Sequence, residues 1–151
     1  MLILNLVLFL IIQTKVDAAT VSKTFTSNFV IFPIIIITEI KNMTSPLEHS
    51  GQTKDVIVDP NDSFAAIFNA SGAPNTNFTT SIIENSINII TGDGSDATKR
   101  INVSTFTFSG LTSFDGTGNV NGIKVGATFH ILSNNIPGDY SGTATLRIIY
   151  L

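Results

Sequence analysis

The chain has 151 residues, a formal net charge of −3 at pH 7 and no cysteine. Only 13% of its residues are charged, about half the share that is usual in soluble domains. No cluster of basic residues offers a surface to nucleic-acid phosphates. The lack of cysteine excludes a disulfide, a thiolate metal site and a cysteine nucleophile, so packing alone must stabilise the fold.

The N-terminal region reads as an export signal. Leu2–Ile12 is an almost unbroken apolar run, long enough for the hydrophobic region of a signal peptide and too short to span a bilayer as a helix. Val16 and Ala18 provide the small residues expected before a cleavage site. We therefore expect a signal peptide at residues 1–18 and a single domain at residues 19–151. No Lys or Arg precedes the apolar run, which leaves an uncleaved anchor as the alternative.

These features predict an exported protein of the periplasm, the cell surface or the extracellular space. After signal cleavage we expect no stable membrane span.

After the signal peptide, apolar and polar residues alternate, as in strands that bury one face. Ile34–Ile37 is a continuous β-branched run and predicts a strand buried on both faces. Short strands are predicted around residues 56–58 and 64–68. The stretch 77–91 predicts two strands with a break near Glu84.

One predicted strand changes parity in its middle. Its apolar residues Ile101 and Val103 are odd-numbered, whereas Phe106 and Phe108 are even-numbered. A strand that keeps one face in the core cannot do this without an extra residue. We therefore predict a β-bulge near Ser104–Thr105.

Two more strands close the chain. Alternation predicts one over Ile123–Ile131 and the other over Tyr140–Tyr150, joined by turn residues at Asn134–Asp139. Ser113–Gly122 is rich in Gly, Asp and Asn and predicts a loop. The whole pattern predicts an all-β, immunoglobulin-like or pilin-like β-sandwich of seven to nine antiparallel strands.

No group of residues predicts an active site. His130 lies on the polar face of its strand, and since spacing gives it no partner, we expect it to be solvated or hydrogen-bonded. The pairs Asp59/Asp62 and Asp93/Asp96 lie in turns, where aspartates cap backbone N–H groups. No serine sits in a strand-turn-helix elbow. We expect no enzymatic activity, no cofactor and no metal site.

The C-terminal stretch has a more specific pattern. A glycine and a series of alternating residues lead to a tyrosine one residue before the last. They are Gly138, Tyr140, Ala144, Leu146, Ile148 and Tyr150. This pattern resembles the C-terminal strand of bacterial fimbrial subunits assembled by the chaperone–usher route. The resemblance implies that these residues bind a partner strand by β-augmentation.

A second resemblance extends over residues 56–151. The chain is similar to an uncharacterised family of bacterial exported domains, whose members are often regarded as fimbria-like surface proteins. Four of its segments, "A-x-F-x-V-x-G", "V-G-G-T-L", "P-A-G-x-Y-x-G" and "V-x-Y", have counterparts here in the same order. The counterparts are Phe64–Gly72, Val125–Phe129, Ile136–Gly142 and Ile148–Tyr150. The partners implied are like subunits or a periplasmic chaperone.

We therefore expect an exported, fimbria-like structural or adhesive subunit of the cell surface, with β-strand complementation as one route of assembly. The donor-strand candidates are Val21, Phe25 and Phe29. The alternative is a self-complete secreted sandwich that binds carbohydrate or a host protein through its loops, with Ser113–Gly122 as the first choice.

Overall fold

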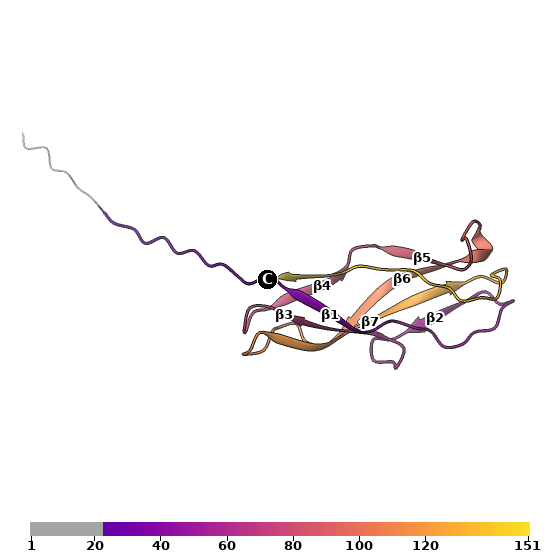
Figure 1. Ribbon diagram of the computed structural model, residues 1–151, viewed down its shortest axis with the longest axis horizontal. Helices are drawn as coiled ribbons and strands as arrows, with labels where there is room; N and C mark the ends of the chain where they lie inside the picture. Colours follow the sequence, from indigo (N-terminus) through magenta and orange to yellow (C-terminus); the bar gives the residue numbers. More distant parts are fainter. Residues whose placement is uncertain (1–22) are drawn as a thin grey trace, which may run out of the picture. The chain divides into compact units, whose positions relative to one another are not determined.

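The computed structural model describes residues 23–151. The predicted signal peptide at residues 1–18 and the donor candidate Val21 lie outside the described residues. The chain divides into two compact units, residues 1–30 and 31–151. In the first unit, residues 23–30 form no helix or strand. All regular structure described below belongs to the second unit (Figure 1).

The second unit consists of strands, with one short 3-10 helix. Its elements are β1 (Ile36–Lys41), β2 (Lys54–Val58), β3 (Ala66–Ser71), β4 (Phe78–Ile82), β5 (Ser86–Ile90), η1 (Ala97–Lys99), β6 (Arg100–Ser109), β7 (Asn119–Ile131) and β8 (Leu146–Tyr150). All pairings between these strands are antiparallel. The prediction of an all-β sandwich with seven to nine antiparallel strands is confirmed. The break predicted near Glu84 separates β4 from β5.

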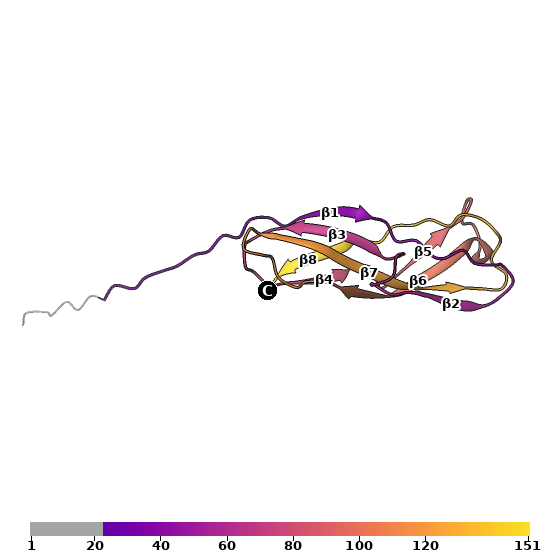
Figure 2. The ribbon, with the colours of Figure 1, turned by 90° about the horizontal axis from the view of Figure 1, so that it is seen from below.

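The larger sheet is organised around β7. One edge of β7 pairs with β6, and β5 follows on the far side of β6. The other edge pairs with two strands in succession, β3 along residues 119–125 and β2 along residues 127–131. β1 lies outside β3. The smaller sheet contains β4 and β8, which lie side by side near one end of β7 in Figure 2.

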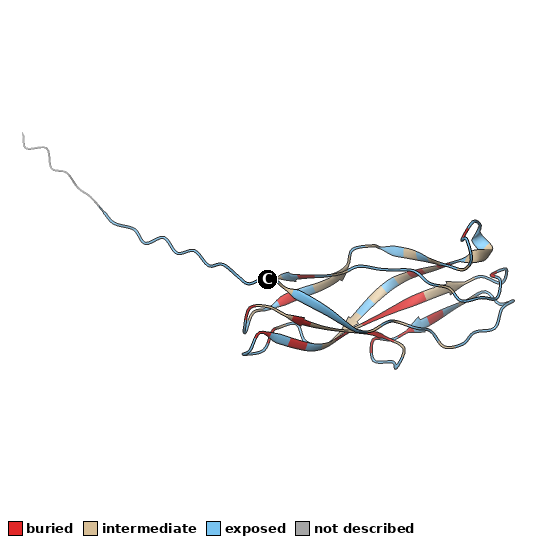
Figure 3. Cartoon of the chain, in the orientation of Figure 1, coloured by how far each residue is buried: buried red, intermediate tan, exposed pale blue. Residues whose placement is uncertain are grey.

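The core lies between the smaller sheet and the β3 half of the larger sheet. The rings of Phe78 and Phe114 meet there with centroids 4.8 Å apart. Each of these large side chains stabilises the fold by roughly 2–3 kcal/mol when fully buried. Buried positions concentrate along β7 and its neighbours in Figure 3. The core cluster consists of Ala70, Phe78, Phe114, Val120, Ile123 and Ile148.

The predicted β-bulge is confirmed. The register between β6 and β7 shifts between Ser104 and Thr107, so Thr105 and Phe106 lie opposite the single residue Ala127. Thr105 has a φ of 52°, the left-handed conformation that the first residue of one bulge type adopts. The extra residue lets both halves of β6 keep their apolar side chains on the core face.

Two expectations about strands are wrong. The run Ile34–Ile37 is not buried on both faces: Ile34 is 80% exposed and Ile36 is 55% exposed. The reason is that β1 pairs with β3 alone and lies at the edge of its sheet. The last strand is also shorter than predicted. The alternation starts at Tyr140, whereas β8 begins only at Leu146.

Candidate functional site

Tyr150 ties three parts of the second unit together. Its hydroxyl accepts a hydrogen bond from the Ala73 N–H (2.7 Å) and donates one to the Pro33 carbonyl oxygen (2.9 Å). Its ring centroid lies 5.1 Å from that of Phe32 and 5.8 Å from that of Phe114. The tyrosine that the fimbrial resemblance singles out therefore anchors the chain just before β1 onto the core.

The other predicted partner-binding residues fall into two groups. Leu146, Ile148 and Tyr150 belong to β8, and their side chains pack in or against the core cluster. Gly138, Tyr140 and Ala144 precede β8. At Gly138, a β-carbon would lie 2.6 Å from the Thr91 hydroxyl oxygen, so a glycine lets this segment approach Thr91.

The backbone of β8 has one paired edge. The Leu151 N–H donates to the Asn77 carbonyl, and the Ile83 N–H donates to the Thr145 carbonyl. In an antiparallel pair, every second residue of a strand directs its N–H and C=O groups to the neighbouring strand. In β8 the odd-numbered residues direct these backbone groups to β4. The N–H and C=O groups of Leu146, Ile148 and Tyr150 point to the opposite edge. Across residues 23–151, β8 pairs with no strand other than β4.

A cavity of about 720 Å³ lies over the other half of the larger sheet. Two irregular segments border it, residues 42–50 after β1 and residues 135–142 before β8. Neither β4 nor β8 contributes a residue to its lining, so the smaller sheet covers only the β3 half of the larger one. Inward-facing apolar side chains from β2, β5, β6 and β7 form the floor: Val56, Ile89, Ile101, Phe129 and Ile131.

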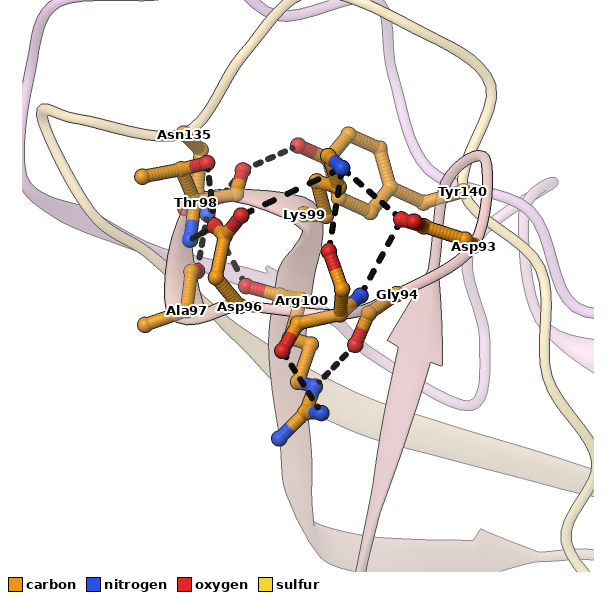
Figure 4. Close-up of polar contacts among 10 residues, drawn as sticks. Asp93, Gly94, Asp96, Ala97, Thr98, Lys99, Arg100, Asn135 and Tyr140 are labelled. Carbon is orange, nitrogen blue, oxygen red and sulfur yellow. Dashed lines mark hydrogen bonds and ion pairs between the residues drawn. The ribbon is translucent and has the colours of Figure 1, made fainter.

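One border of this cavity is held in place by polar contacts (Figure 4). The buried Asn135 side-chain amide donates to the carbonyl oxygens of Ala97, Thr98 and Arg100 at 2.9–3.2 Å. The Tyr140 hydroxyl lies 2.9 Å from the Thr98 carbonyl oxygen, and burial raises the pKa of that hydroxyl. These contacts attach the segment 135–142 to η1 and to the start of β6.

The aspartates near η1 stabilise their own turn. Lys99 Nζ donates to Asp93 Oδ1 at 2.8 Å. This bond, followed by hydrogen bonds from Ser95, lowers the pKa of Asp93 to about 2. Asp96 caps η1 by accepting from the Thr98 N–H at 2.8 Å. Both carboxylates therefore cap backbone groups, as the sequence predicts.

The loop at Ser113–Gly122, which the alternative function would use to bind carbohydrate or a host protein, is held in shape by one carboxylate. Asp115 Oδ1 accepts from the backbone N–H groups of Thr117 (2.8 Å) and Asn119 (2.9 Å). These hydrogen bonds, that of Asn119 foremost, lower the pKa of Asp115. The strand β7 begins at Asn119, inside the stretch predicted as loop. Asp115 therefore shapes this loop by accepting its backbone hydrogen bonds.

The donor candidates Phe25 and Phe29 lie in the first unit, among residues without regular structure. They are 90% and 87% exposed, and Ile31, which shares their parity, is 81% exposed.

The structure gives His130 two partners that sequence spacing did not reveal. Its Nδ1 lies 2.7 Å from Asp55 Oδ1, and its Nε2 lies 2.8 Å from Ser104 Oγ. The expectation that His130 is hydrogen-bonded is confirmed. Its partners come from β2 and β6, and only the strand order places them beside β7. The parity change at Ser104 was the one local signal.

Residues 23–151 contain no group of three or more His, Asp and Glu side chains arranged to hold a metal ion. The same residues include no helix that is long and apolar enough to cross a membrane.

Comparison with known proteins gives one match. No curated protein and no solved structure matches the chain. A family model, described as a domain of unknown function (DUF4402), matches residues 41–150.

Proposed function

The chain belongs to the DUF4402 family of domains of unknown function, and from that premise we propose that it is an exported, fimbria-like subunit of the cell surface that assembles by β-strand complementation. In this mode, an extended segment of one chain adds a strand to the incomplete sandwich of another. Its role in the assembly is structural or adhesive.

The observation that carries the proposal is the uncovered half of the larger sheet. Apolar side chains such as Ile101 and Phe129 line a cavity there that the smaller sheet does not reach. Filling it with apolar side chains would stabilise the fold by about 25 cal/mol for each Å² removed from water. A strand placed between residues 42–50 and 135–142 would fill this space.

A strand edge that has no partner among residues 23–151 follows the segment that borders the cavity. The segment 135–142 leads towards β8, whose outer edge presents the backbone groups of Leu146, Ile148 and Tyr150. Backbone hydrogen bonds along such an edge give affinity, and side-chain pockets give specificity. β8 is short, which limits unwanted pairing with other edges.

The chain also contains a segment suited to the role of donor. Phe25, Phe29 and Ile31 have the same parity, so in an extended strand they point to one face. All three are exposed to solvent. Ser27 interrupts this face, so the donor offers three large apolar side chains to a partner.

The experiment uses the protein from residue 19 onwards and a synthetic peptide of residues 20–32. We expect the protein to form oligomers in size-exclusion chromatography. The double variant Phe25→Ser/Phe29→Ser removes the donor side chains but leaves the cavity intact. This variant should be monomeric, and the wild-type peptide should raise its melting temperature.

A peptide that carries the same two serine substitutions is the matched control and should leave the melting temperature unchanged. A wild-type protein that is monomeric and melts at the same temperature with or without the peptide would overturn the proposal.

A further inference from the structure

A hydrogen-bonded array of three side chains crosses the outer face of the larger sheet, opposite the cavity. Asp55 on β2, His130 on β7 and Ser104 on β6 form it, in that order across three neighbouring strands. Val56 follows Asp55 and Val103 precedes Ser104, and both valines are buried on the other face of the sheet. Strand register therefore places the array: Asp55 lies directly opposite His130 in the β2–β7 ladder.

The two distances determine the chemistry of the imidazole ring. A carboxylate can only accept a hydrogen bond, so Asp55 at 2.7 Å from Nδ1 favours the tautomer with its proton on Nδ1. The lone pair of Nε2 then faces the Ser104 hydroxyl at 2.8 Å. This is the arrangement in which a histidine takes a proton from a serine nucleophile while a carboxylate orients the ring.

The backbone beside Ser104 gives an independent observation. Thr105, the next residue, has a φ of 52°, a conformation that is a steric outlier for a β-branched side chain. Such strain costs on the order of 1–3 kcal/mol and concentrates at functional sites. The bulge interrupts the regular ladder directly after Ser104, and the ladder resumes at Thr107. The Thr105 hydroxyl lies 3.4 Å from Ser104 Oγ, as a polar neighbour of the nucleophile.

We propose that Ser104, His130 and Asp55 form an acyl-transfer site in which Ser104 is the nucleophile. The site is independent of strand complementation, because it lies on the opposite face of the sheet from the cavity. The side chains of His130 and Asp55 are 36% and 59% exposed. The site is therefore open to an acyl ester displayed on a larger molecule.

The reaction proceeds in two steps. Ser104 Oγ bonds to the ester carbonyl carbon and its proton moves to His130 Nε2. The bond between that carbon and the alcohol oxygen then breaks, and the leaving oxygen takes the proton from His130. In the second step, a water molecule gives a proton to His130 and attacks the acyl-serine. The carboxylic acid leaves and Ser104 recovers its proton.

The test uses the exported protein from residue 19 onwards and a fluorophosphonate probe, which phosphonylates activated serines. We expect mass spectrometry to find the probe on Ser104. The variant His130→Gln should lower the rate of labelling by about 100-fold or more, the usual contribution of a general base. The variant Asp55→Asn should also lower this rate, since it no longer selects the tautomer that accepts the serine proton. Thermal melting shows which variants remain folded.

Ser81 on β4 is the matched control. It is a strand serine with a side-chain neighbour, Arg147, that cannot act as a base. We expect no probe on Ser81 in the wild-type protein or in any variant. Labelling of Ser104 no faster than that of Ser81, or unchanged by His130→Gln in the folded protein, would overturn the proposal. The array would then serve only to join β2, β7 and β6.

Discussion

Gly72 and Tyr150 lie so close together that a β-carbon on Gly72 would be 2.5 Å from the tyrosine hydroxyl oxygen. Gly72 ends one of the four sequence segments on which the predicted family resemblance depends, and Tyr150 ends another. The fold thus brings two separate parts of the resemblance into contact. The glycine leaves room for the Tyr150 hydroxyl to reach the Ala73 N–H.

The first prediction follows from this contact. The variant Gly72→Ala should destabilise the protein by roughly 1–3 kcal/mol, the usual cost of overpacking a core, because the added methyl group displaces Tyr150. Urea unfolding measures this change. Gly116→Ala is the control, because beyond its chain neighbours the added β-carbon would have only Asn75 Oδ1 within 4 Å, at 3.8 Å. Equal midpoints for the two variants would contradict the prediction.

The strained bulge leads to a second prediction. The variant Thr105→Gly should stabilise the protein by about 1 kcal/mol, because glycine adopts a φ of 52° without a steric penalty. Thr107 is also exposed and lies two residues further along β6, but it is not among the residues with a positive φ. Thr107→Gly should therefore destabilise the protein by about 0.5–1 kcal/mol. Differential scanning calorimetry compares the two, and opposite signs are expected.

The third prediction concerns acid. The pKa of Asp93 is lowered from 3.8 to about 2, so the folded protein favours the ionised carboxylate more than the unfolded chain does. Its contribution to stability is full above pH 3.8 and disappears as the pH falls towards 2. An NMR titration of the Asp93 carboxyl carbon should give a midpoint near 2. In the variant Lys99→Met the midpoint should rise, and an unchanged midpoint would show that Lys99 is not the cause.

Asn135 gives the fourth prediction. Its amide donates to three carbonyl oxygens in a buried position, and Asn135→Asp would replace that donor with a second acceptor. We expect a loss of about 2 kcal/mol or more at pH 7, because the carboxylate is buried against carbonyl oxygens. The neighbouring Asn134 is exposed, and Asn134→Asp should change stability by less than about 0.5 kcal/mol. Chemical denaturation distinguishes the two.

Much of this fold could be predicted from local pattern. The alternation of apolar residues located most of the strands, and the change of parity between Val103 and Phe106 located the bulge. Both depend on the two-residue period of a strand, which is a property of the sequence itself. The error at Ile34–Ile37 has the opposite origin. The β-branched residues of this run indicate β-propensity, whereas the burial of a strand depends on which parts of the chain pack against its two faces.

The site was harder to predict, because its residues meet only through strand order. Asp55 and His130 are far apart in the sequence but directly opposite each other in the ladder. No spacing rule links them, since any of several strands could have paired with β7. The cavity could not be predicted from one segment either. It exists because the smaller sheet is too short to cover the whole larger sheet.

The central position of β7 has a consequence for how the chain folds. Lys54 pairs with Ile131 and Ala66 pairs with Val125, so β2 and β3 reach β7 only by closing long loops. Such non-local pairing slows folding. In a chain that emerges from its N-terminus, β2 has no partner strand until residues 127–131 of β7 have appeared. The pairs β1–β3 and β5–β6 can form earlier, but the larger sheet is joined into one only when β7 arrives between β6, β3 and β2.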